Sequence, residues 1–169
     1  LLIKGGAYLE EARKLTHVAL DKTGTITAGR PQLVARELLR PDADPAQVWS
    51  LAAGLAGQSD HPVTKAIAQG LTDAAPAALA VADFTAEAGR GTRGRVGAQA
   101  LALGNHRWIE ERGQCSPALE ERLHEHEQQG RSVSILADEQ GVLALFAVAD
   151  AIKPSSVEAV RELFALGVE

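Results

Sequence analysis

The chain of 169 residues contains one cysteine, Cys115, no methionine and few aromatic residues. A single cysteine excludes an intrachain disulfide and any CxxC metal site, and we expect a free thiol. Because only 4% of the residues are aromatic, the core must consist mainly of alanine, leucine and valine. The scarcity of rings for base stacking, a net charge of −5 and the absence of a basic stripe all argue against a nucleic-acid partner.

Long hydrophobic runs are also missing. The longest apolar candidate, residues 142–148, suits a buried strand and is far shorter than the ~20 residues that a membrane span needs. The length allows one ordinary domain, or one domain with part of another. Since the chain begins with leucine and has no methionine, we expect a piece of a longer protein with no signal peptide in view.

The most informative pattern is DKTGTIT, residues 21–27. It follows the apolar run 17–20, which predicts a buried strand of a parallel sheet. Asp21 would then lie at the carboxyl end of that strand, where open α/β sheets place their chemistry. The small residues after it offer amides and hydroxyls that suit a phosphoryl group attacked by the carboxylate. The pattern arises by chance in roughly one chain in a million of this length.

Periodicity and turn residues predict an α/β fold. The expected helices are residues 6–15, 45–55 with Asp44 as N-cap, 62–74, 105–112, 117–129 and 154–166. The expected strands are residues 17–20, 32–39, several within 81–103 around a glycine-rich turn at 89–94, 132–137 and 142–149. One compact unit over residues 32–147 is therefore flanked by pieces of a different sheet, which is the arrangement of an inserted domain.

A second constellation begins with Ser59-Asp60-His61-Pro62 at the start of a predicted helix. A histidine there lies beside unpaired amides, with a ring free to stack on a planar ligand, although alone it would be a cap. Gly89 and Gly91 follow in a strand turn, where missing Cβ atoms let a ligand approach the backbone. Gly104-Asn105 forms a third small polar junction.

In this order the motifs resemble the heavy-metal (type IB) branch of the P-type ATPases, and the resemblance spans the whole chain. DKTGT[IL]T is the phosphorylation signature of that family. The resemblance implies that Asp21 takes the γ-phosphoryl of ATP and forms an aspartyl-phosphate. Lys22 and Thr23 would help to position the phosphate, and Asp21 with the Thr23 carbonyl would supply part of a Mg²⁺ site.

The resemblance also implies a nucleotide pocket in which His61 lies against the adenine ring. The implied ATP-binding residues are Asp60, His61, Gly89, Gly91, Gly104, Asn105 and Asp150. Asp150 and Lys153 would steady the hinge and the ribose-phosphate side of the nucleotide. The residue pattern equally predicts that Asp150 ends a strand and Lys153 starts a helix.

Two positions depart from the family pattern. Asp60 stands where glutamate is usual, and Ala56 stands where the family has a glutamate that contacts adenine. A lost hydrogen bond of that kind weakens binding several-fold, by about 0.5–1.5 kcal/mol. Gln58 or Asp60 is a candidate to replace the contact.

The resemblance implies two domains. Residues 1–31 and 148–169 would belong to a haloacid dehalogenase-like phosphorylation domain with a parallel sheet. Residues 32–147 would form an α+β ATP-binding domain with an antiparallel sheet and flanking helices. The carboxyl half of the phosphorylation domain, with further magnesium ligands, lies outside this sequence. We therefore expect the chain to bind ATP without forming aspartyl-phosphate at a useful rate.

The implied partners are ATP, Mg²⁺, the actuator and transmembrane domains of the same pump, and a transported divalent heavy-metal ion. The pump would lie in a membrane, with this part at the cytoplasmic face of a bacterial inner membrane. Residues 4–10 look more like the zinc, cadmium, cobalt and lead exporters than the copper pumps.

Two other functions compete with this one. A haloacid dehalogenase phosphatase places an aspartate two residues after the nucleophile, and Thr23 cannot act as that acid or base. A non-catalytic nucleotide-sensing module remains an alternative, since Ala56 and the partial magnesium site fit it. Among the other histidines, we expect His17 and His106 to be structural.

Overall fold

The computed structural model describes residue 11, residues 13–75, residue 77 and residues 79–169. The helix predicted over residues 6–15 lies mostly outside the described residues. The chain divides into two compact units, residues 1–30 with 150–169, and residues 31–149. Among the described residues, every helix is too short or too polar to span a bilayer.

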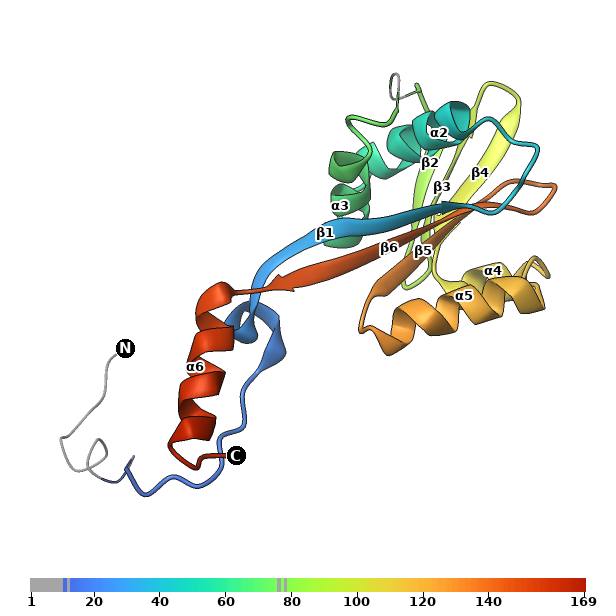
Figure 1. Ribbon diagram of the computed structural model, residues 1–169. Helices are drawn as coiled ribbons and strands as arrows, with labels where there is room; N and C mark the ends of the chain where they lie inside the picture. The colour runs from blue at the N-terminus through green and yellow to red at the C-terminus, as the bar shows by residue number, and fades with distance from the viewer. Residues whose placement is uncertain (1–10, 12, 76, 78) are drawn as a thin grey trace. The chain divides into compact units, whose positions relative to one another are not determined.

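A six-stranded sheet forms the centre of the larger unit, in the order β1-β6-β5-β4-β3-β2 (Figure 1). The strands β2 to β6 pair antiparallel in sequence order, which confirms the predicted antiparallel sheet. The strands are β1 (Thr27–Leu38), β2 (Ala82–Glu87), β3 (Gly91–Val96), β4 (Gln99–Gly104), β5 (Ser132–Ala137) and β6 (Val142–Ile152).

Helices cover both faces of this sheet (Figure 1). One core cluster joins α2 (Pro45–Gly57) and α3 (Pro62–Gly70) to strand residues such as Leu136 and Phe146. A second cluster joins α4 (His106–Glu111) and α5 (Pro117–Gln128) to Ile135 and Leu145. Successive strand side chains point to opposite faces, so the neighbours Ile135 and Leu136 serve different cores.

The helices of this unit begin where the sequence predicts. Asp44, His61, Asn105 and Ser116 are the N-caps of α2, α3, α4 and α5, and each side chain accepts a backbone N–H of the first turn. The prediction for α3 was too long, because the helix ends at Gly70 rather than near residue 74. The Thr72 hydroxyl bonds back to the Gln69 carbonyl at 2.9 Å and so competes with continued helix.

The glycine-rich stretch is also arranged differently from the prediction. The turn occupies residues 88–90, while Gly91 and Gly94 lie inside β3. A Cβ on Gly94 would meet the Val81 side chain at 2.4 Å. This glycine therefore serves close packing within the unit rather than a turn.

A buried ion pair fixes the connection between β5 and β6. Both carboxylate oxygens of Asp138 accept from Arg40, at 2.8 and 2.7 Å, and Asp138 is only 4% exposed. Burial alone would raise the pKa of Asp138. Hydrogen bonds from Arg40, from the Gln140 amide and from Gln99 outweigh it, so the pKa lies below its usual value.

The smaller unit corrects one prediction. Residues 17–20 form no strand, and three of the four are exposed, with only Val18 half-buried. The backbone bonds of this region run to Glu169, from Val18 N to its carbonyl and from its N–H to Thr16 O, both 2.8 Å. An apolar run is stabilised as a buried strand only when other elements cover it, and no described element covers this one.

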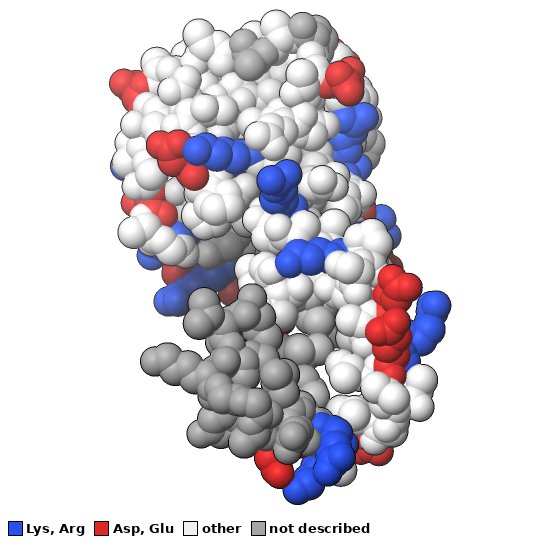
Figure 2. All heavy atoms as spheres, turned by 90° about the vertical axis from the view of Figure 1, so that its left-hand side faces the viewer, with Lys and Arg blue, Asp and Glu red and all other residues white. Residues whose placement is uncertain are grey.

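The last helix, α6 (Pro154–Ala165), begins after Lys153 as predicted. Its apolar residues are not buried, since Phe164 is 64% exposed and Val157 is 49% exposed. On the face drawn in Figure 2, lysine and arginine side chains are interspersed with aspartate and glutamate, and in several places the two kinds adjoin.

Candidate functional site

A cavity of about 500 Å³ opens in the unit of residues 31–149. Its walls come from the start of α3, the turn between β2 and β3, the end of β4 and the start of β5. Five of the seven predicted ATP-binding residues line it, namely His61, Gly89, Gly91, Gly104 and Asn105. Segments more than 40 positions apart in the sequence therefore meet at one cavity.

His61 combines two roles that the sequence left as alternatives. Its ring Nδ1 accepts the N–H of Val63 at 3.3 Å, which makes it the cap of α3. Thr64 donates to its carbonyl at 2.9 Å, and the backbone N–H of His61 donates to Ser59 at 3.3 Å. The imidazole is thus held by its own helix while it lines the cavity, which leaves Nε2 to carry the ring proton.

The glycines at the cavity have a reason beyond ligand access. Gly91 and Gly104 pair directly across β3 and β4. A Cβ on Gly91 would lie 2.2 Å from the Leu103 carbonyl oxygen, and one on Gly104 would lie 2.3 Å from the Trp108 ring. Gly89 differs, since it has φ +70° and open space around a Cβ. The strand pair thus needs glycine at 91 and 104 before any ligand is considered.

Asn105 ties two walls of the cavity together. Its side-chain oxygen accepts the Trp108 N–H at 3.0 Å and caps α4. Its side-chain nitrogen donates to the Gly89 carbonyl at 2.8 Å, and its backbone N–H donates to the Arg90 carbonyl at 2.8 Å. The turn between β2 and β3 is therefore held against the start of α4.

Thr92 is a cavity residue that the sequence did not single out. It lies in β3 directly after Gly91 and is only 3% exposed. Its hydroxyl has no hydrogen-bond partner, and among the described residues no other fully buried side-chain polar atom lacks one. An unpaired buried hydroxyl is costly, and this oxygen has less than 1 Å² of exposed surface, so it destabilises the free unit and is not presented to a ligand in the cavity. The only sequence signal was its place beside the glycine motif.

The charged residues that line the cavity, Glu87 and Arg90, are already paired, and two further arginines of β3 outside its lining also have partners. Arg90 contacts Glu111 at 2.8 Å, and Arg93 contacts the lining residue Glu87 at 2.8 Å. Arg95 bonds to the Ala98 carbonyl at 3.2 Å. These arginines are therefore not a bare cationic patch.

Asp60 does not line the cavity. Its fully exposed side chain pairs with Lys65 at 2.7 Å, and this hydrogen bond with the lysine charge lowers the pKa of Asp60. Ala56, where the family pattern has a glutamate, is completely buried in the core of α2. Neither Gln58 nor Asp60 reaches the cavity lining, whereas Ser59 does.

The phosphorylation motif lies in the smaller unit. Asp21 is exposed and precedes a tight turn, η1 (Lys22–Ile26), that exposes Lys22 and Thr23. Gly24 adopts φ +78°, which favours glycine, and its N–H donates to the buried Thr27 hydroxyl at 3.3 Å. The local chain thus presents a carboxylate beside an ammonium and small hydroxyl residues.

Asp150 and Lys153 hold this turn from the other end of the unit. Asp150 accepts from the Thr27 hydroxyl at 2.5 Å and from the N–H groups of Gly29 and Arg30 at 3.1 and 3.0 Å. These contacts, with the Thr27 bond the largest cause, lower the pKa of Asp150. The Lys153 ammonium donates to the Gly24 carbonyl at 2.5 Å. Both oxygens of Asp150 are therefore used to fix the backbone after the turn.

Comparison with known proteins identifies the family of this chain. The sequence model of the haloacid dehalogenase-like hydrolases matches residues 15–169. The whole chain is 38% identical to 23% of a probable copper-transporting ATPase of Synechococcus elongatus. It is 30% identical to 24% of a probable cadmium-transporting ATPase of Staphylococcus aureus. The chain thus spans about a quarter of the length of these relatives.

Solved structures agree with the sequence comparison. A zinc-transporting PIB-type ATPase in the E2.Pi state superposes with a TM-score of 0.81 at 29% identity, over 99% of this chain and 27% of that one. The resemblance drawn from DKTGTIT and His61-Pro62 is confirmed. The chain belongs to the haloacid dehalogenase-like hydrolases, and along its whole length it matches a segment of the heavy-metal P-type ATPases.

Proposed function

We propose that residues 31–149 bind ATP, and that the unit of residues 1–30 and 150–169 carries the aspartate that accepts its γ-phosphoryl group. The observation that carries the proposal is the meeting of His61, Gly89, Gly91, Gly104 and Asn105 at one cavity. A volume of about 500 Å³ falls within the ~300–1,000 Å³ of ordinary small-molecule sites.

In this proposal the purine ring packs on the His61 imidazole. Stacking suits a flat ring held at a fixed angle, and the hydrogen bond from Val63 N–H to Nδ1 fixes the His61 ring. This chain has Ala56 where the family has a glutamate that contacts adenine. Ser59 is the described lining residue nearest to that position in the sequence, and it replaces part of the contact to adenine.

At the other unit, Asp21 acts as the nucleophile. A carboxylate oxygen of Asp21 bonds to the γ-phosphorus, the bond to the β-γ bridging oxygen breaks, and ADP leaves. Lys22 offsets charge on the transferred oxygens. Because Thr23 supplies no acid or base, the aspartyl-phosphate is hydrolysed slowly by this chain's own residues.

Magnesium fits the donors that this chain offers. The Asp21 carboxylate and the Thr23 carbonyl are oxygen donors on an exposed loop, which is the ligand class that Mg²⁺ prefers. Bound there, the ion would neutralise phosphate charge. These two groups are part of an octahedral set, so we expect tight Mg²⁺ binding only with further carboxylates.

The complete protein, in this proposal, couples ATP hydrolysis to export of a heavy-metal ion across a membrane. Its actuator and transmembrane domains would be the partners, and this part would face the cytoplasm of a bacterium. The relatives include copper-, cadmium- and zinc-transporting ATPases, so the preference for zinc, cadmium or cobalt stays a prediction.

The first test is a calorimetric titration of the chain with ATP. His61→Asn keeps a capping oxygen but removes the ring, whereas His61→Ala removes both. We expect both variants to weaken ATP binding by about tenfold, and only His61→Ala to lose about 1 kcal/mol of stability. His124→Asn, an exposed histidine on α5, is the matched control. Equal affinity in wild type and His61→Asn contradicts the stacking role.

The second test concerns Asp21 and uses a complete pump that contains this segment. Radiolabelled ATP should give an acid-stable label that Asp21→Asn abolishes. Thr23→Asp should shorten the lifetime of that label, because it restores an acid or base two residues after the nucleophile. ATP binding without any label in the complete pump would favour the nucleotide-sensing alternative instead.

A further inference from the structure

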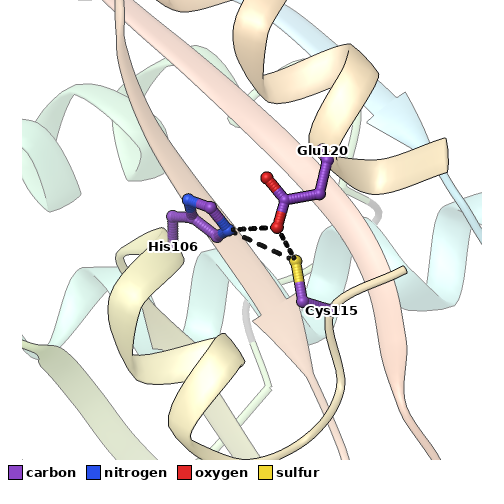
Figure 3. Close-up of side chains that lie close together, drawn as sticks. All are labelled: His106, Cys115 and Glu120. Carbon is purple, nitrogen blue, oxygen red and sulfur yellow. Dashed lines mark hydrogen bonds and ion pairs between the residues drawn. The ribbon is translucent and has the colours of Figure 1, made fainter. Parts of the chain in front are cut away.

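A second cluster of reactive side chains lies on the α4–α5 side of the sheet. His106 is the first residue of α4, Cys115 lies in the connection to α5, and Glu120 lies in the first turn of α5 (Figure 3). The His106 Nε2 is 3.0 Å from Glu120 Oε1 and 3.3 Å from Cys115 Sγ. The Sγ and Oε1 atoms are 3.1 Å apart. Three different donor atoms thus form a nearly equilateral triangle.

This triangle does not suit nucleophilic catalysis. In a cysteine, histidine and carboxylate triad, the imidazole uses one ring nitrogen for the nucleophile and the other for the acid. Here Nε2 faces both partners (Figure 3). Burial and the Glu120 carboxylate raise the pKa of Cys115 to about 11, the reverse of an activated thiol. Convergence on one point is instead the geometry of a metal site.

We propose that His106, Cys115 and Glu120 bind a divalent d¹⁰ cation, Zn²⁺ or Cd²⁺, through one imidazole nitrogen, one thiolate and one carboxylate oxygen. All three ligand atoms lie within 4.8 Å of one another. A tetrahedral zinc ion with ordinary bond lengths separates such ligands by about 3.4–3.6 Å. Each atom therefore needs to move only a few tenths of an ångström, and water takes the fourth position.

The donor set selects the ion. Mg²⁺ and Ca²⁺ prefer oxygen ligands alone, whereas thiolate and imidazole favour Zn²⁺ and its heavier congener. A thiolate and a carboxylate together carry two negative charges, which neutralise a dication. The Cys115 thiol donates a hydrogen bond to Glu120. Metal binding releases this thiol proton to solvent.

The site is reachable from solvent. The side chain of His106 is 31% exposed and that of Glu120 is 50% exposed, while Cys115 is partly buried. All three belong to the unit of residues 31–149, so the site needs no other part of the protein. Since none of them lines the ATP cavity, this proposal and ATP binding can fail independently.

The test is a metal titration of the reduced, untagged chain without nucleotide. Zn²⁺ is added against a competing chromophoric chelator, and Co²⁺ serves as a spectroscopic probe for thiolate ligation. We expect one bound ion per chain and a thiolate-to-cobalt charge-transfer band. Removing a group that only hydrogen-bonds to a metal ligand already lowers metal affinity by about 10–100-fold. We therefore expect Cys115→Ser and Glu120→Gln each to weaken Zn²⁺ binding by about 100-fold or more.

Two control variants separate this site from other donors. Glu121→Gln changes the neighbouring carboxylate of α5, and His124→Asn changes an exposed histidine of the same helix. Both should bind Zn²⁺ as the wild type does. Thermal unfolding of the metal-free variants checks that each variant keeps its fold. If one of the two ligand variants, Cys115→Ser or Glu120→Gln, fails to fold, the other still tests the site. Equal Zn²⁺ affinity in Cys115→Ser and Glu121→Gln, or no charge-transfer band in the wild type, would overturn the proposal.

Discussion

Replacing Thr92 by valine should stabilise the free protein and leave ATP binding nearly unchanged. The Thr92 hydroxyl is buried at the cavity wall without a partner. Valine has nearly the same shape and removes only the unpaired group. Because an unpaired buried hydroxyl costs about 1–3 kcal/mol, we expect the free energy of unfolding to rise by about 1 kcal/mol. For a domain of this size, that raises the melting temperature by roughly 4 °C.

The effect on ATP binding should be small. The Thr92 hydroxyl oxygen has less than 1 Å² of exposed surface, so no hydrogen bond to the nucleotide is lost and the dissociation constant should change by less than about twofold. Thermal unfolding of the free protein and calorimetric titration with ATP measure the two quantities separately.

Thr64 provides a matched control at the same cavity. It is also buried, but its hydroxyl donates to the His61 carbonyl at 2.9 Å. Thr64→Val should therefore lower the free energy of unfolding by about 1 kcal/mol. A lower melting temperature for Thr92→Val would show that this hydroxyl has a partner, and a large loss of ATP affinity would show that the nucleotide reaches it; either result would refute the reasoning.

Three further predictions follow from the contacts. Asp138→Asn should lower the unfolding free energy at pH 7 by about 3 kcal/mol, because Arg40 stays buried without its charge partner. Because the pKa of Asp138 is lowered in the folded state, its contribution to the free energy of unfolding is present above about pH 4 and is lost as the pH falls through the folded-state pKa. The difference in unfolding free energy between wild type and Asp138→Asn, measured by urea unfolding, should therefore shrink below about pH 4. Gly104→Ala should cost about 1–3 kcal/mol in thermal unfolding, as its Cβ would meet the Trp108 ring at 2.3 Å. Asn105→Asp keeps the cap of α4 but cannot donate to the Gly89 carbonyl, so calorimetry should show weaker ATP binding with less loss of stability than Asn105→Ala.

The sequence predicted best what depends on neighbouring residues. Asp44, His61 and Asn105 cap their helices because each side chain reaches the amides of the next turn. Five of the seven residues that the family motifs led us to expect at a nucleotide site also line one cavity. Residues 17–20 failed as a buried strand because burial depends on the elements that cover a run, not on its own composition.

Other features arise only from the tertiary arrangement. Gly91 and Gly104 are needed for a close strand contact, which a GxG pattern does not reveal. The unpaired hydroxyl of Thr92 is visible only once its surroundings are known. His106, Cys115 and Glu120 have no familiar ligand spacing, and we expected His106 to be merely structural. Two helices and a connecting loop bring them together.

The bond between Thr27 and Asp150 has a consequence for the order of folding. It joins residues 123 positions apart, and closing a flexible loop of that length costs roughly 4 kcal/mol of chain entropy. Once residues 31–149 have folded, pairing of β1 with β6 already brings the two ends together. The inserted unit then acts as the turn of one very long hairpin. The loop that carries Asp21 should therefore become ordered only after that unit, and mutations that slow the unit's folding should delay the loop by the same factor.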